Sequence, residues 1–383
     1  MPRGPRVSVA LPVRNAESFL AQALESLVSQ TLADFEIIVV DDGSVDGTPE
    51  ILSAFASRDR RIKVHRQASL GFVNAVNTAL QLAAGDYLAR MDGDDVALPD
   101  RLERQCDLLD SDPELGAVAG TVVVIGPDGN VLRTWPVSET DRAIRTTLRR
   151  TNPFCDPAVM IRRSALRKVG GYRAAFGPAA DYDLWLRISE HFRLGALREP
   201  VLLYRWHPGQ LSTRSVRSQL VGLVAARSAA QSRLLHRADP FDGVEQIELD
   251  TLRHIGLDGT SVEAELQAEA AARASFFAAI GQAHEARQLL DEVVGSAKHG
   301  SAGRVVTAQV RLAYARARFG EGARGDAFRW FVGACAADPV AVARAACRGA
   351  GELVSSAPRR SAFVRPRVHA EPPAKRPDGS GAN

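Results

Sequence analysis

Arg90-Met91-Asp92-Gly93-Asp94-Asp95 is the stretch that decides the fold and the chemistry of this chain. It follows residues 85–89, an apolar run of strand length between turn residues. The carboxylates should therefore emerge at the carboxyl end of a strand, where open α/β sheets bind their ligands. Because three crowded acids repel one another, they predict a bound cation such as Mg²⁺ or Mn²⁺, which prefers oxygen ligands. An acidic turn that binds nothing is the alternative, and an EF-hand calcium loop is disfavoured because its closing Glu is missing.

Two earlier apolar runs have the same character. Residues 7–13 and 36–40 are rich in aliphatic side chains, and the second run leads directly into Asp41 and Asp42. Between the two runs, apolar residues recur at helical spacing through residues 19–28. Alternating strands and helices predict parallel βαβ units, so we expect the N-terminal part to form a nucleotide-binding α/β sheet.

The composition is that of an ordinary soluble protein. The chain has 383 residues, 45% of them hydrophobic and 24% charged, which is enough for about two or three domains. The net charge of +3 is too small to indicate nucleic acid binding, and the first half has no basic patch interleaved with aromatic residues. We therefore expect a small-molecule partner and no nucleic acid.

The cysteines and the apolar segments indicate in which cellular compartment the protein works. The four cysteines are widely spaced and form no CxxC or Cys/His cluster, which argues against structural zinc and favours a reducing compartment. The first apolar run is too short for a signal peptide and contains Pro12, and no uninterrupted apolar stretch has spanning length. We expect a cytoplasmic protein, with peripheral contact at the inner face of the membrane as an option.

Five segments occur in a characteristic order along the first half of the chain. They are residues 9–17, 39–44, 92–95, 170–172 and 181–187. Together they resemble the family 2 glycosyltransferases with the GT-A fold, and the similarity extends over residues 7–212. An ordered set of five is far more specific than any one of its members.

The resemblance implies an inverting, metal-dependent transfer of a sugar from a nucleoside-diphosphate donor, UDP- or dTDP-linked in most members. By matching position, the donor would be contacted by Pro12, Val13 and Glu17 near the base, by Asp42 at the base or ribose, and by Arg90 and Asp92 at the nucleoside or phosphate. Asp94, with Asp95 as its close rival, would hold the Mn²⁺ or Mg²⁺ that bridges the diphosphate.

Two further residues receive roles. Attack on the sugar needs a base that takes the proton of the acceptor hydroxyl, and the resemblance suggests Asp181. The alternative for Asp181 is a carboxylate favoured by the helix dipole alone. His207 follows the last predicted strand, and we hypothesise that it reaches the metal or the diphosphate, as loop histidines do in several GT-A enzymes. A solvated turn residue is the alternative for His207.

Three positions depart from the family pattern. Ala180 stands where members usually have Glu before the base, Asp156 where many have His, and Val76 where a basic residue is frequent. These departures motivate a rival hypothesis, a weak or inactive nucleotide-sugar-binding module that acts through its helical domain. A sugar nucleotidyltransferase is disfavoured, because the loop after the first strand has no glycine. The processive Gln-x-x-Arg-Trp signature is missing, which predicts one sugar added per encounter.

We divide the chain into a GT-A domain (residues 1–214), a helical domain (215–356) and a disordered basic tail (357–383). A helical bundle is favoured over tetratricopeptide repeats, because the spacing of the helix pairs exceeds the usual period. The tail would be attracted to anionic lipid head groups, which suits a lipid-linked acceptor. A saccharide acceptor is equally compatible, and the oligomeric state stays open.

Overall fold

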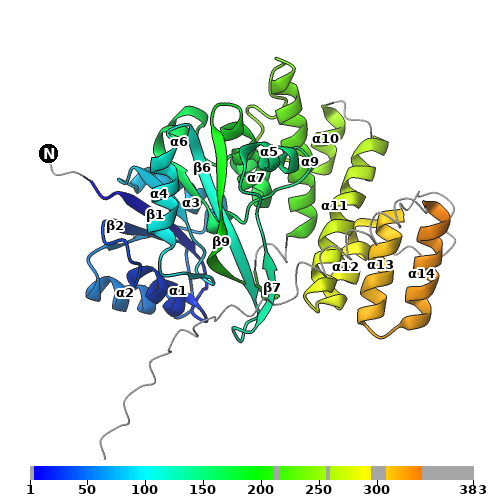
Figure 1. Cartoon of the computed structure of the whole chain (residues 1–383), viewed down its shortest axis with the longest axis horizontal. Helices are drawn as coiled ribbons and strands as arrows, with labels where there is room; N and C mark the ends of the chain where they lie inside the picture. The colour runs from blue at the N-terminus through cyan, green and yellow to red at the C-terminus, as the bar shows by residue number, and fades with distance from the viewer. Residues whose placement is uncertain (1–3, 211–214, 256–258, 295–307, 339–383) are drawn as a thin grey trace, which may run out of the picture.

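The computed structural model of the protein describes residues 4–210, 215–255, 259–294 and 308–338. An α/β unit comes first along the chain and a set of helices follows it, and the two lie on opposite sides of the view in Figure 1. This arrangement confirms the predicted fold class, a GT-A type sheet with a helical extension. The domain boundary after residue 214 stays a prediction, and the predicted basic tail lies outside the described residues.

One sheet organises the α/β unit. Its strands are β1 (Val7–Val13), β2 (Phe35–Asp41), β3 (Ile62–Arg66), β4 (Tyr87–Arg90), β5 (Val96–Ala97), β6 (Leu115–Ile125), β7 (Val131–Trp135), β8 (Met160–Arg162) and β9 (Arg193–Arg205). The strand order is β3-β2-β1-β4-β8-β6-β9-β5, and β7 pairs with β6. β8 is antiparallel to both β4 and β6, so β6 and β9 run in the same direction as β1 to β4. The sheet is therefore mostly parallel among the described residues.

Helices cover both faces of this sheet, which explains why its central strands are continuous apolar runs. All seven residues of β1 and all seven of β2 are buried, whereas only Ile62 is buried in the edge strand β3. Helices α1 (Leu20–Val28) and α4 (Arg101–Ser111) share one apolar cluster with β1 and β2, and α3 (Phe72–Leu82) packs on the other face. The remaining helices of the unit are α2 (Thr48–Arg58), α5 (Asp141–Leu148), the 3₁₀ turn η1 (Asp156–Ala158), α6 (Arg163–Val169), the 3₁₀ turn η2 (Ala174–Ala179) and α7 (Ala180–Ser189).

The helical part shares an apolar core with the α/β unit. It consists of α9 (Val216–Leu234), α10 (Leu249–His254), α11 (Gly259–Ala279), α12 (Ala283–Val294), α13 (Ala308–Gly320) and α14 (Arg324–Ala337). α9 packs tightly on η2, because a Cβ at Gly222 would lie only 2.8 Å from the carbonyl oxygen of Phe176. One apolar cluster runs from α7 through α9 to α11 and α13. Within the described residues, every helix is too short or too polar to cross a membrane.

Candidate active site

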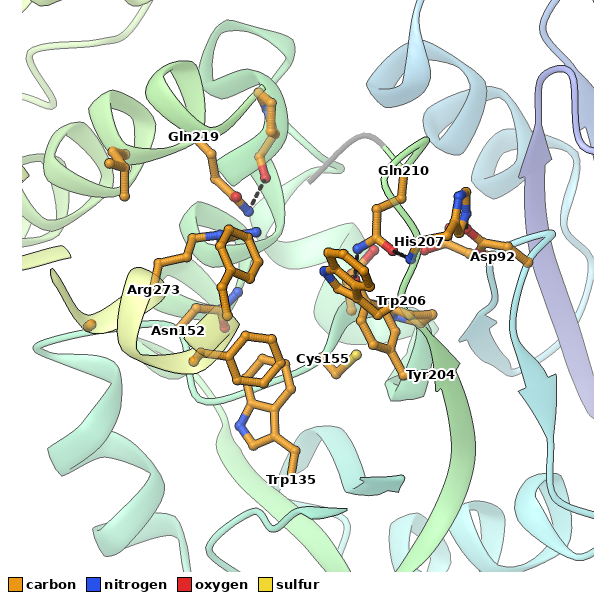
Figure 2. A pocket seen from close by; sticks show the side chains of 18 of the residues that line it. Asp92, Trp135, Asn152, Cys155, Tyr204, Trp206, His207, Gln210, Gln219 and Arg273 are labelled. Carbon is orange, nitrogen blue, oxygen red and sulfur yellow. Dashed lines mark hydrogen bonds and ion pairs between the residues drawn. The ribbon is translucent and has the colours of Figure 1, made fainter. Parts of the chain in front are cut away.

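A cleft of about 2250 Å³ lies where parallel strands β1, β2 and β4 reach their carboxyl ends. Pro12 and Val13 from β1, Asp42 after β2 and Asp92 after β4 line one part of it. Side chains of α11, α13 and α14 line another part, so the helical extension faces the sheet across a shared space. Figure 2 shows Asp92 and His207 on one side of this cleft and Asn152 and Arg273 on the other.

The acidic stretch after β4 forms a compact carboxylate cluster. Ligand oxygens of Asp92, Asp94 and Asp95 all lie within 4.8 Å of one another. Asp95 is fully buried; its Oδ1 accepts a hydrogen bond of 2.8 Å from the Arg205 backbone N–H, and its Oδ2 has no hydrogen-bond partner among the described residues. Burial, reinforced by Asp94 and Asp92, raises the pKa of Asp95 well above its ordinary value. A bound cation would offset the repulsion among the three carboxylates and would give Oδ2 of Asp95 a partner.

Glycine at position 93 lets this loop reach the end of β1. A Cβ there would lie 2.9 Å from Cγ1 of Val13, closer than two carbon atoms tolerate. Arg205, at the end of β9, fixes the loop from the other side, because its Nε donates to the Asp94 carbonyl oxygen at 2.8 Å. Sequence reasoning gave Arg205 no role, although it stands two residues before His207.

Arg90 is buried between two carboxylates. Its Nη2 donates to Asp92 at 2.5 Å and its Nε donates to Asp156 at 2.7 Å. The Tyr172 hydroxyl donates to the other oxygen of Asp156 at 2.7 Å. Asp156, noted above only as a departure from the family pattern, is therefore part of the site. A fully buried arginine with two acidic partners holds Asp92 in a fixed orientation.

His207 reaches the carboxylate cluster from a distant part of the chain. Its Nε2 lies 3.0 Å from Oδ2 of Asp94, and its ring packs on Phe19 with 5.3 Å between the ring centroids. β9 carries the chain to this place, because its last residues pair with β6 beside the cleft. The hypothesised metal role of His207 stays a prediction, and the required proximity is present.

Asp181 lines the same cleft in the first turn of α7. Its Oδ2 accepts a hydrogen bond of 2.7 Å from the Asn152 side-chain amide, and its Oδ1 accepts one of 2.7 Å from the Tyr182 backbone N–H. Burial, followed by the charge of Asp156, raises the pKa of Asp181 to about 7. A carboxyl group with such a pKa can accept and release a proton near neutral pH.

Of the four residues expected near the nucleoside, three line the cleft and one does not. Pro12 and Val13 line the cleft. Asp42 also lines it, and its carboxylate accepts hydrogen bonds from the backbone N–H groups of Leu70 and Gly71 at 2.8 and 3.0 Å. Glu17 is exposed, lies outside the cleft lining, and accepts a hydrogen bond of 2.7 Å from the Gly47 backbone N–H.

The family model and the two relatives compared with this chain are all described as glycosyltransferases. The model of the family described as "Glycosyl transferase family 2" matches residues 8–170. The chain is 35% identical over 223 residues to EpsE of Bacillus subtilis (strain 168), an alignment that covers 56% of this chain and 78% of that protein. It is 30% identical over 206 residues to the O-antigen biosynthesis glycosyltransferase WbnJ of Escherichia coli, covering 52% of this chain and 80% of that protein.

A solved structure is also similar in outline. The mannosyltransferase PcManGT from Pyrobaculum calidifontis, in complex with GDP-Man and Mn²⁺, aligns with a TM-score of 0.48 and 18% sequence identity. The alignment covers 87% of this chain and 86% of that chain.

Proposed function

Because the chain belongs to glycosyltransferase family 2, we propose that this glycosyltransferase moves one sugar, with inversion, from a nucleoside-diphosphate donor to a saccharide or lipid-linked acceptor. The donor is a UDP- or dTDP-sugar, as in most of the family. Pro12, Val13 and Asp42 contact its nucleoside, and Asp92, oriented by Arg90, faces its phosphates. Glu17 acts from outside the cleft, through the loop that contains Gly47.

The carboxylate cluster fits a divalent cation, Mn²⁺ or Mg²⁺. The support is the buried Oδ2 of Asp95, which has no hydrogen-bond partner among the described residues, together with the neighbouring oxygens of Asp92 and Asp94. Asp94 and Asp95 would hold the ion, with His207 beside Asp94. When bound, such an ion offsets the negative charge that develops on the departing diphosphate.

Asp181 takes the proton of the attacking hydroxyl. Its carboxylate is oriented by the Asn152 amide at 2.7 Å, and its raised pKa, about 7, makes it a better base than an ordinary aspartate. Asp156 contributes to this raised pKa by its charge, so the residue that departs from the family pattern tunes the base. Inversion requires attack on the sugar face opposite the leaving diphosphate, and the base belongs on that face.

The observation that carries this proposal is that a carboxylate cluster and a separate carboxyl group of pKa about 7 line one cleft. The test is thermal unfolding with UDP, dTDP, GDP and CDP, each with and without Mn²⁺. A nucleotide at ~100 times its Kd should add about 2.7 kcal/mol of stability. We expect stabilisation by one diphosphate that depends on Mn²⁺. No response to any of the four would refute the donor site.

A second candidate is a binding module that holds the nucleotide sugar without turnover. Ala180 favours it, because this buried residue next to Asp181 supplies no second carboxyl group where the family usually has one. Release of nucleoside diphosphate from the donor separates the two candidates, since only an enzyme produces it.

The biological setting is the assembly of a surface polysaccharide or glycoconjugate. The similarity to a glycosyltransferase named for O-antigen biosynthesis supports this setting. We also propose a cytoplasmic protein that contacts the membrane peripherally through the basic residues 357–383. Flotation with anionic vesicles of the full chain, but not of a chain ending at residue 356, is the expected result. Equal flotation of both would contradict the membrane contact.

A further inference from the structure

The helical extension supplies one wall of the cleft, and this wall has a definite chemistry. Phe276 on α11 packs against Trp135 at the end of β7, with 5.7 Å between the ring centroids. The guanidinium of Arg133 lies 5.8 Å from the centroid of the Phe276 ring. Aromatic faces pack well against the C–H faces of a sugar ring, so this wall suits a saccharide.

α11 is held in place by contacts with two other segments of the chain. Arg227 on α9 forms ion pairs with Glu265 at 2.8 Å and with Glu269 at 2.6 Å. Phe277 packs against Trp206, with 6.3 Å between the ring centroids. These contacts join α11 to α9 and to the segment that follows β9, so the wall is built on rigid elements.

Arg273 places a positive charge in this wall. It lines the cleft, and its guanidinium lies 5.7 Å from the centroid of the Phe277 ring. Burial lowers the pKa of Arg273, while Tyr204, Asp181 and Glu269 act in the opposite direction through their charges. Asp181, the proposed base, is therefore near enough to influence this guanidinium. Figure 2 shows Arg273, Asn152, Gln219 and Trp135 together on the side of the cleft away from Asp92.

The two sides of the cleft differ in charge. The side formed by the strand ends carries Asp42, Asp92 and Asp94 together with Arg14 and Arg90, and Arg90 is already paired with Asp92 and Asp156. Among the described residues that β7, α11, α13 and α14 contribute to the lining, the charged ones are four arginines and one acid: Arg133, Arg273, Arg316, Arg324 and Glu269. Glu269 is engaged by Arg227. An anionic group is thus favoured on the helical side without any metal.

Gln219 contributes a polar atom to the side of the cleft on which Figure 2 shows Arg273. Gln219 on α9 lines the cleft and donates through Nε2 to the Pro178 carbonyl oxygen at 3.3 Å. Its Oε1 is buried and has no hydrogen-bond partner among the described residues. This amide oxygen is an acceptor that a sugar hydroxyl could satisfy.

We propose that Arg273 binds an anionic group of the acceptor saccharide, a carboxylate or a phosphate, while Trp135 and Phe276 hold the sugar ring. This inference rests on the proposed function, because it assigns the acceptor end of the same cleft. The planar guanidinium matches both anions through paired hydrogen bonds. The helical extension thereby selects an acidic acceptor over a neutral one.

The test compares three probes that differ at one carbon atom: p-nitrophenyl β-glucoside, the corresponding glucuronide, and the glucoside 6-phosphate. Their dissociation constants are measured by calorimetry, with and without UDP and Mn²⁺. The wild-type protein should bind at least one anionic probe about ten-fold more tightly than the glucoside, the effect of one charge-assisted hydrogen bond. Preference for the glucuronide alone assigns a uronic acid, and preference for the phosphate alone assigns a phosphorylated sugar. Equal binding of all three overturns the proposal.

Substitutions test whether Arg273 causes the preference for anionic probes. Arg273→Gln should lose the anionic preference, Arg273→Lys should keep part of it, and Arg217→Gln, at an exposed arginine of α9 outside the cleft, should keep all of it. A preference that survives in Arg273→Gln overturns the assignment to this residue. The wild-type comparison decides the charge preference even if Arg273→Gln does not fold. Failure of UDP to bind would refute the donor site only, since the probes are also measured without nucleotide.

Discussion

Replacement of Asp181 by Asn tests the base through two independent properties. The substitution keeps the shape of the side chain and an oxygen that can accept from Asn152, but it removes the ability to take a proton. Transfer should fall by a factor of about 10²–10⁴, the usual contribution of a general base. In the wild-type protein, kcat/KM should rise with pH through about 7, because only the ionised carboxylate is a base and its pKa is about 7.

The same substitution should stabilise the fold in a pH-dependent way. Burial raises the pKa of Asp181 from 3.8 to about 7, so the folded protein keeps this proton longer than the unfolded chain does. The resulting stability is fully present below pH 3.8 and is lost as the pH rises through about 7. At alkaline pH the ionised carboxylate costs about 4 kcal/mol, from about three pKa units at about 1.4 kcal/mol each. Between about pH 5.5 and about pH 8.5, the advantage of Asp181→Asn should grow by about 2 kcal/mol.

Urea unfolding of both proteins at the two pH values measures this difference, and any pH-independent effect of the amide cancels. Asp86→Asn is the matched control, because Asp86 is exposed and lies outside the cleft lining. It should alter neither transfer nor the pH dependence of stability. If Asp181→Asn gained nothing between the two pH values, the buried, proton-retaining environment assigned to Asp181 would be wrong. Transfer at the wild-type rate would remove its role as the base.

Three further substitutions test the rest of the site. Asp95→Asn should abolish Mn²⁺-dependent stabilisation by the diphosphate. It should also raise the melting temperature of the metal-free protein, because burial raises the pKa of Asp95 and makes its ionised form costly. A metal response like that of the wild type would contradict the metal role of Asp95. His207→Ala should weaken Mn²⁺-dependent nucleotide binding by about ten-fold in calorimetry, and unchanged binding would leave His207 without a metal role. Asp156→Asn should move the rise of kcat/KM to lower pH, because the charge of Asp156 raises the pKa of Asp181; an unmoved profile would show that Asp156 does not tune the base.

Local pattern was sufficient to predict the position of the acidic cluster. Asp92 and Asp94 follow a buried strand, and the carboxyl ends of parallel strands meet at one edge of a sheet. The resemblance to a family added His207, and the structure brings its ring to Asp94 although 113 residues separate them in the chain. These parts could be predicted because strand periodicity and motif order are properties of the sequence itself.

Contacts between distant segments could not be predicted in this way. Arg90 and Asp156 are 66 residues apart, and nothing in the pattern around either one indicates their ion pair. The return of α11 over the cleft depends on how α9 packs against η2, which no local periodicity encodes. Nothing in the sequence around Arg273 distinguishes it from the other arginines of the helical part, and its place in the wall of the cleft follows only from the tertiary structure.

The most direct test of the proposed function measures nucleoside diphosphate by chromatography after the protein is incubated with each of a panel of UDP- and dTDP-sugars, with and without a chelator. The proposed glycosyltransferase activity predicts release from one donor that stops when the metal is chelated, returns with added Mn²⁺, and is lost in Asp181→Asn when an acceptor is supplied. Binding of a diphosphate with no release from any donor would contradict it and would establish the chain as a binding module.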